Sequence, residues 1–199
     1  MIILPAAYLP SIRYVACIAS GDCVIDIGEH FVKRSERNRA LILAPDGVMP
    51  LTVHVAHADR PRTPVRDIRL DYSKRWQHLH WRALMSYYRS SPYFDHYAPR
   101  LERFYTHRWD WLADYDIELT SVLLGCLGLP MPRVSDSYIA ATDGDTDLRP
   151  KGASFAPFRE VPYVQVFADR QPFAGGLSFA DLLFCEGPGS KDVLRGSLR

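Results

Sequence analysis

Long apolar stretches are missing from this 199-residue sequence. Its longest apolar runs, Met1 to Leu4 and Ser121 to Leu129, fall far short of the ~18 to 20 residues that span a bilayer. The chain also opens without the basic segment and small-residue cleavage site of a secretory signal. We therefore expect no membrane span and a cytoplasmic location.

An excess of charge of either sign is missing too. Lys and Arg number 24 against 23 Asp and Glu, which gives a formal net charge of +1 and a pI near 7.7. Nucleic-acid-binding modules are typically strongly basic, so we expect no nucleic-acid partner. The composition, 47% hydrophobic and 24% charged, is that of an ordinary globular protein, and the length fits one domain over residues 1–199.

Motifs for metal binding and for common hydrolases are absent. The four cysteines form no C-x-x-C pair, as is typical of reduced thiols in an intracellular protein. The acidic run Asp143 to Asp147 resembles the start of a calcium loop, but Leu148 stands where the turn needs glycine and Ser154 where a bidentate Glu belongs. Neither G-x-S-x-G nor H-E-x-x-H occurs. We expect no metal site, and the sequence predicts no particular cofactor.

Hydrophobic patterning predicts an α/β fold with a mixed sheet, with α+β as the alternative. The first two predicted strands flank a helix over residues 8–20, which makes an N-terminal βαβ unit with a ligand-facing loop after its first strand. The pair Asp46-Gly47 predicts a hairpin turn. The predicted strands are residues 1–5, 22–27, 41–44, 50–55, 65–72, 133–140 and 161–168.

A central block of three helices is predicted at about residues 74–128, because apolar residues recur there at spacings of three and four. Its members are a helix over 74–89, one over 96–108, and one from Leu112 that ends before Gly128. Residues 142–157 form a long loop, of the kind that often carries function. A short helix capped by Ser178 follows near the end of the chain.

The segment after the second predicted strand concentrates side chains capable of chemistry. Lys33, Arg37 and Arg39 are suited to clamp phosphate or carboxylate groups. Asn38 or Arg39 can donate hydrogen bonds to a developing oxyanion, and Glu29 can accept a proton. A solvated loop accounts for the same residues equally well, so both interpretations stay open.

A second set of candidates lies where basic and aromatic residues alternate. Residues 60–111 hold eleven basic and five acidic residues together with twelve aromatics, a pattern that suits an anionic, stackable ligand. His80 is the best general-base candidate, because histidine titrates near neutrality. The alternative is a solvated basic face above an aromatic core. The remaining candidates for binding are His78 for an anion, Trp81 or Tyr88 for stacking on a base, and Lys151 as a further cation.

Several stretches, in this order and spacing, resemble the WbqC-like family, and most closely its shorter, Bacteroides-type branch. They are Tyr8-Leu9-Pro10, Lys33-Arg34-Ser35, Arg37-Asn38-Arg39, Trp76 to Trp81, Ser91 to Phe94, Tyr163 to Phe167, and Leu177 to Phe184 with Gly187-Pro188. The family is associated with gene clusters for bacterial O-antigen and related polysaccharides. The resemblance implies a role in polysaccharide biosynthesis, with transfer of glycine or another acyl group to a sugar.

These observations lead to one hypothesis and one main alternative; the βαβ unit taken alone also suggests a nucleotide-activating enzyme on a doubly wound fold, by analogy of fold. The hypothesis is a transferase that acts on an amino sugar, an anionic small molecule such as a nucleotide sugar, with His80 or Glu29 activating the amine. The alternative is a non-catalytic binding or scaffolding protein of the polysaccharide assembly machinery. An enzyme should place Glu29, Arg39 and His80 around one concave site, whereas a scaffold should scatter them and expose an apolar patch. The sequence predicts no oligomeric state.

Overall fold

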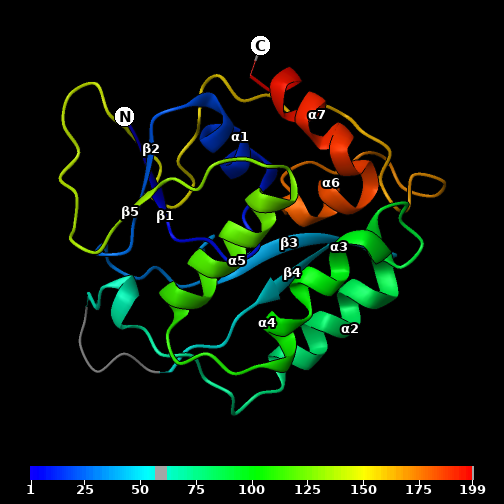
Figure 1. The fold of residues 1–199 in the computed structure, drawn as a ribbon, viewed down its shortest axis with the longest axis horizontal. Coiled ribbons are helices and arrows are strands. Elements are labelled where there is room, and N and C mark those ends of the chain that lie inside the picture. Colours follow the sequence, from blue (N-terminus) through cyan, green and yellow to red (C-terminus); the bar gives the residue numbers. More distant parts are fainter. Residues whose placement is uncertain (57–61, 199) are drawn as a thin grey trace.

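The computed structural model describes residues 1–56 and 62–198 and contains a four-stranded parallel sheet with the strand order β5-β2-β1-β6, of which β1, β2 and β5 lie at the left of Figure 1. Each neighbouring pair runs parallel. The strands are β1 (Ile2–Pro5), β2 (Cys23–Asp26), β5 (Arg133–Ser135) and β6 (Thr146–Asp147).

The first two strands and helix α1 (Ile12–Ser20) form the predicted βαβ unit. The helix begins after Ser11, whose side chain accepts a hydrogen bond from the Tyr14 amide. It ends at Gly21, where φ is +138°, a conformation that residues with a Cβ rarely adopt. Both strands are almost fully buried, as expected of parallel strands covered on both faces.

A separate antiparallel hairpin joins β3 (Arg39–Ala44) to β4 (Gly47–Thr52) through the predicted Asp46-Gly47 turn. The φ of Gly47 is +116°, which explains why glycine follows Asp46. The predicted α/β class is therefore confirmed. Parallel and antiparallel pairing occur in two sheets, because β3 and β4 pair only with each other among the described strands.

The predicted helical block is present: α2, α3 and α4 lie together at the lower right of Figure 1, and α5 crosses the middle of the molecule. Its second member is divided: the helix ends at Leu101 and resumes at Arg103, after a first half that contains Pro99, a residue without an amide hydrogen. The helices of the block are α2 (Trp76–Tyr88), α3 (Phe94–Leu101), α4 (Arg103–Thr106) and α5 (Leu112–Cys126). The later helices are α6 (Phe179–Glu186), the 3-10 turn η2 (Gly187–Gly189) and α7 (Ser190–Gly196).

Two predicted strands are wrong. Residues 65–72 open with a 3-10 turn, η1 (Val65–Asp67), and afterwards form only isolated bridges. Residues 161–168 pair with no strand among the residues that the structure describes, and side-chain contacts hold the segment instead. Gln165 exchanges two hydrogen bonds with the backbone of Ala174, and Glu186 accepts one from the amide of Val164.

Two other predicted elements differ from the prediction: one strand is shorter, and one loop contains a short strand. The strand predicted over 133–140 keeps only the three residues of β5. The loop predicted over 142–157 contains the two-residue strand β6, which carries no hydrophobic pattern and exists only because β1 lies beside it.

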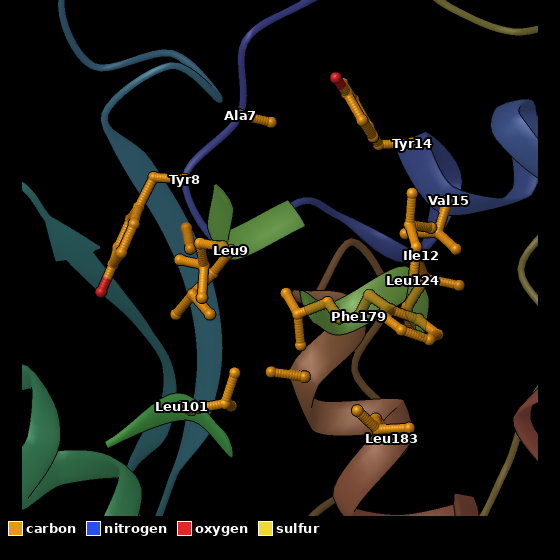
Figure 2. Close-up of a cluster of buried hydrophobic side chains, with 14 of the residues drawn as sticks. Ala7, Tyr8, Leu9, Ile12, Tyr14, Val15, Leu101, Leu124, Phe179 and Leu183 are labelled. Carbon is orange, nitrogen blue, oxygen red and sulfur yellow. The ribbon is translucent and has the colours of Figure 1, made fainter. Parts of the chain in front are cut away.

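The core forms where the loop after β1 meets α1, α5 and α6 (Figure 2). Leu9, Ile12 and Phe179 are buried in this cluster, and α6 has buried residues at seven of its eight positions. No helix among the described residues is long and apolar enough to cross a membrane.

Candidate functional site

A cavity of about 400 Å³ opens at the carboxyl ends of β1 and β6. Its walls come from the loops after these two strands, from residues 34–37 after β2, from the start of β3, and from the turn before α6. The carboxyl ends of parallel strands are where ligands of open α/β sheets usually bind. The predicted ligand-facing loop after β1 does line this cavity, and so does the long loop that contains β6.

The cavity is lined by six basic residues and one acidic residue. Three of the basic residues already have carboxylate partners: Arg13 pairs with Glu36, Arg37 with Glu29, and Arg149 with Asp26 and Asp147. The other three form no ion pair with any residue that the structure describes; they are Arg34, Arg39 and Lys151. Three positive charges without an ion-pair partner in the described part of the chain therefore line one concave site.

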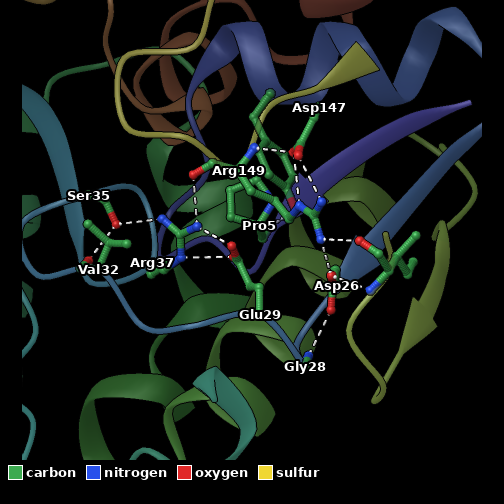
Figure 3. A network of polar contacts seen from close by, with 11 residues as sticks. Pro5, Asp26, Gly28, Glu29, Val32, Ser35, Arg37, Asp147 and Arg149 are labelled. Atoms are coloured by element: carbon green, nitrogen blue, oxygen red, sulfur yellow. Dashed lines mark hydrogen bonds and ion pairs between the residues drawn. The ribbon is translucent and has the colours of Figure 1, made fainter. Parts of the chain in front are cut away.

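The pair of Arg37 and Glu29 forms a buried support beneath the cavity (Figure 3). Nε of Arg37 donates to Oε1 of Glu29 at 2.8 Å, and Nη2 donates to Oε2 as well as to the carbonyl oxygen of Arg149 at 2.9 Å. Burial raises the pKa of Glu29 to about 7, although the contacts with Arg37 act to lower it. Since both of its oxygens are occupied and it does not line the cavity, Glu29 serves to hold Arg37 in place.

Arg149 joins the ends of two strands (Figure 3). Its Nη1 lies 2.5 Å from Oδ2 of Asp26, at the end of β2, and its Nη2 lies 2.7 Å from Oδ2 of Asp147, at the end of β6. These hydrogen bonds lower the pKa of Asp147 and raise that of Arg149. The guanidinium group is therefore held rigidly at the wall of the cavity, with little freedom to lose when a ligand binds.

The backbone at the cavity is in an unusual conformation at two positions. The φ of Leu9 is +42° and that of Arg34 is +57°, a region that costs non-glycine residues energy and that clusters at functional sites. The turn at Arg34 is held by Asn38, whose Oδ1 accepts from the Arg34 amide at 2.9 Å and whose Nδ2 donates to the carbonyl of Val53 at 3.0 Å. Asn38 is buried and shapes the loop that presents Arg34.

Two helix N-termini also reach the cavity. Ser11 and Ser178, the residues that cap α1 and α6, both line it and face each other in an isolated β-bridge. The Ile12 amide donates to the carbonyl of Leu177, and the Phe179 amide donates to that of Pro10. The positive ends of two helix dipoles therefore add to the field of the unpaired cations.

His80 lies away from the cavity. It is 6% exposed, and its Nδ1 lies 2.9 Å from the hydroxyl of Tyr8, a residue of the cavity lining. Burial lowers the pKa of His80 to about 3. The imidazole is therefore neutral at physiological pH and contacts the site only through Tyr8.

The other candidates of the basic and aromatic stretch do not reach the cavity, and none of the described residues 62–111 belongs to its lining. His78 is exposed on α2, and Trp81 stacks on Tyr105 with ring centroids 5.3 Å apart. Tyr88 is fully buried, donates to Asp181 at 2.5 Å and accepts from the Leu43 amide.

Of the ten candidate residues, the structure brings three together at the cavity: Arg37, Arg39 and Lys151. Lys33 lies next to Arg34 in the chain but does not line the cavity. Sequence reasoning missed four charged residues of the lining, which are Arg13, Arg34, Glu36 and Arg149. Arg34 and Glu36 lie within the segment already singled out, and Arg149 lies in the long loop predicted over 142–157, whereas Arg13 lies in the predicted helix over 8–20, which gave no chemical signal.

Comparison with known proteins gives one family. The sequence model of the WbqC-like protein family matches residues 6–151, which is more than half of the chain. The chain belongs to the WbqC-like family. Most of the cavity lining lies in the matched region, while the resembling segments at 163–167 and 177–188 lie beyond it. Searches of the curated proteins and of the solved structures found no match.

Proposed function

We propose that this WbqC-like protein is a transferase of bacterial surface polysaccharide biosynthesis, of the O-antigen type. It binds a phosphate-bearing amino sugar and transfers glycine or another acyl group to the amine. One observation carries the proposal: three cations without a carboxylate partner among the described residues, Arg34, Arg39 and Lys151, face one cavity at the carboxyl edge of the parallel sheet.

Phosphate is the anion that best fits this cavity. Arginine guanidinium groups bind phosphate in a bidentate manner, and lysine adds a point charge. The cavity volume of about 400 Å³ lies within the range typical of small-molecule sites. A sugar phosphate or the diphosphate part of a nucleotide sugar supplies the negative charge that the unpaired cations need.

Recognition of a nucleobase has less support. The two residues expected to stack on a base, Trp81 and Tyr88, pack against Tyr105 and against Phe184 and Asp181, respectively. Among the described residues, Tyr8 is the only aromatic one in the cavity lining, and it is itself buried. The phosphate and the sugar, rather than the base, are therefore the parts of the ligand that we assign to this cavity.

The two residues proposed for amine activation take other roles. Glu29 positions Arg37, and the neutral His80 positions Tyr8. We propose both as positioning residues that keep the cavity in shape, so that neither is the group that receives the proton of the amine.

Calorimetric titration with inorganic pyrophosphate and with uridine diphosphate sugars tests the proposal. We expect binding to wild type, and a loss of affinity of about tenfold for Arg39→Ala and for Lys151→Ala. Lys191→Ala, an exposed lysine on α7, is the matched control and should bind like wild type. If no phosphate compound bound at millimolar concentration, or if Lys151→Ala behaved like the control, the proposal would be wrong.

A scaffolding function is the second candidate, because Glu29, Arg39 and His80 do not meet around one cavity. Incubation of the protein with an amino sugar nucleotide and activated acyl donors separates the two candidates. A transferase produces a mass gain equal to the acyl residue on the sugar, and loses this activity in Arg39→Ala. Binding of the sugar nucleotide without any mass gain from glycyl or acyl thioesters or acyl phosphates would favour the scaffold.

A further inference from the structure

Glu36 is the single acidic residue among those that line the cationic cavity in the described part of the chain. A carboxylate in a site for an anion weakens phosphate binding through like-charge repulsion, unless the ligand itself carries a positive group. The position of Glu36 in the cavity therefore favours a ligand that carries a positive group in addition to its phosphate.

Only one of the two carboxylate oxygens of Glu36 is occupied by residues that the structure describes. Oε1 accepts from the hydroxyl of Ser11 at 3.1 Å and from Nη2 of Arg13 at 3.0 Å. Oε2 accepts no hydrogen bond from the same set of residues, and the side chain is 27% exposed. One oxygen thus fixes the orientation of the carboxylate, and the other is available to a ligand.

The backbone of Glu36 is held as firmly as its side chain. Its carbonyl accepts from the Tyr8 amide at 2.8 Å, which attaches it to the loop after β1. Its neighbour Arg37 is anchored by Glu29, and Arg13 has a second partner in the carbonyl of Ala153. Arg13 therefore does not depend on Glu36 alone, and the carboxylate is presented to the cavity by a rigid frame.

We propose that Oε2 of Glu36 binds the ammonium group of the substrate, so that the cavity selects a ligand with both charges. In this arrangement Arg34, Arg39 and Lys151 bind the phosphate, and Glu36 binds the protonated amine. This inference rests on the proposed function and narrows its substrate class: the acceptor enters with a free amine, and an acylated amine or a hydroxyl in its place is disfavoured.

Three ligands that differ at one position test this inference by calorimetric titration of wild type: glucosamine 6-phosphate, N-acetylglucosamine 6-phosphate and glucose 6-phosphate. We expect the first to bind about tenfold more tightly than the other two, since only it can form the charge-assisted hydrogen bond. Because the comparison uses wild-type protein, it does not depend on how a variant folds.

The variant Glu36→Gln keeps the shape and the acceptor for Ser11 but removes the charge. We expect it to lose the preference for the free amine and to bind glucose 6-phosphate at least as tightly as wild type does. Glu118→Gln, on the surface of α5, is the control and should retain the preference.

The outcomes separate this inference from the proposed function. Equal affinity of wild type for all three phosphates would overturn the role of Glu36 and leave the phosphate site in place. An undiminished preference in Glu36→Gln would also overturn it. If none of the three ligands, pyrophosphate or uridine diphosphate sugars bound, both the inference and the proposed function would be wrong.

Discussion

Nε of Arg37 lies 2.8 Å from Oε1 of Glu29, and both side chains are almost completely buried beneath the cavity. A buried ion pair of this kind adds little net stability, since desolvation opposes the attraction between the charges. Removal of one partner is different, because it leaves the other charge buried without compensation. The pair therefore makes the position of Arg37 depend on Glu29.

At a pH well above 7, where the Glu29 carboxylate is ionised, Glu29→Gln should lower the free energy of unfolding by about 3 to 5 kcal/mol, because the buried Arg37 would lose its countercharge. Urea denaturation measures the change. Glu118→Gln breaks the ion pair with Arg103, whose side chain is 48% exposed, and should cost less than about 1 kcal/mol. If the two variants lost similar amounts of the free energy of unfolding, burial of the Glu29–Arg37 pair would not increase the cost of breaking it.

His80 should make the protein less stable in mild acid. Its pKa is about 3 in the folded state and about 6.5 in the unfolded chain, so that between these values the unfolded state binds the proton more strongly. Stability from this group is complete above pH 6.5 and is lost as the pH falls; at pH 5 the loss is about 2 kcal/mol.

The variant His80→Gln isolates this contribution. Between pH 7 and pH 5 its free energy of unfolding should fall by about 2 kcal/mol less than that of wild type. His78→Gln, on the exposed side of the same helix, should follow wild type. Parallel pH profiles for wild type and His80→Gln would contradict the burial of a neutral imidazole.

Arg34 should strengthen ligand binding while its backbone conformation lowers the stability of the protein. Because its φ is +57°, Arg34→Gly should raise the free energy of unfolding by roughly 0.5 to 1 kcal/mol and at the same time weaken pyrophosphate binding. Arg34→Ala removes the same charge and keeps the strained backbone, so it should lose affinity without any gain in stability. A loss of stability in Arg34→Gly would count against a strained turn.

Gly28 should not tolerate a side chain. A Cβ at this position would collide with the backbone of residues 136–138, with the nitrogen of Tyr138 nearest, so Gly28→Ala should cost about 1 to 3 kcal/mol through forced backbone shifts. Gly125 lies in α5, where a Cβ would meet nothing within 4 Å, and Gly125→Ala should gain roughly 0.5 to 1 kcal/mol. Thermal unfolding measures the expected loss of stability in Gly28→Ala and the expected gain in Gly125→Ala. If Gly28→Ala were as stable as wild type, the close approach of Gly28 to the backbone of residues 136–138 would be refuted.

Local patterns predicted those parts of the fold that short stretches of chain determine. The βαβ unit, the Asp46-Gly47 turn and α5 follow from apolar spacing and from caps within the elements themselves. The strand predicted over 161–168 failed because alternation of apolar residues does not reveal whether a partner strand exists. β6 was missed because two residues are too few to carry a pattern.

The candidate site was predictable only in part, for a related reason. Arg37, Arg39 and Lys151 were singled out by residue type, and they do line the cavity. Tyr88 was not recognisable as a core residue, because its partner Asp181 lies 93 positions away in the sequence. Arg149 could not be assigned to the site for the same reason: its contact with Asp26 spans 123 positions.

The chain segment that contains the short strand β6 is attached to the parallel sheet in two ways. Only two residue pairs join β6 to β1, whereas the Arg149 that follows makes contacts with Asp26, Asp147 and the carbonyl of Ile139. Through Asp26, this cavity-wall side chain attaches the segment to β2, a strand that β6 itself does not border. We therefore expect a substitution of Arg149 to weaken the attachment of β6 to β2 and to change the wall of the cavity, so that this one position affects both the sheet and the binding site.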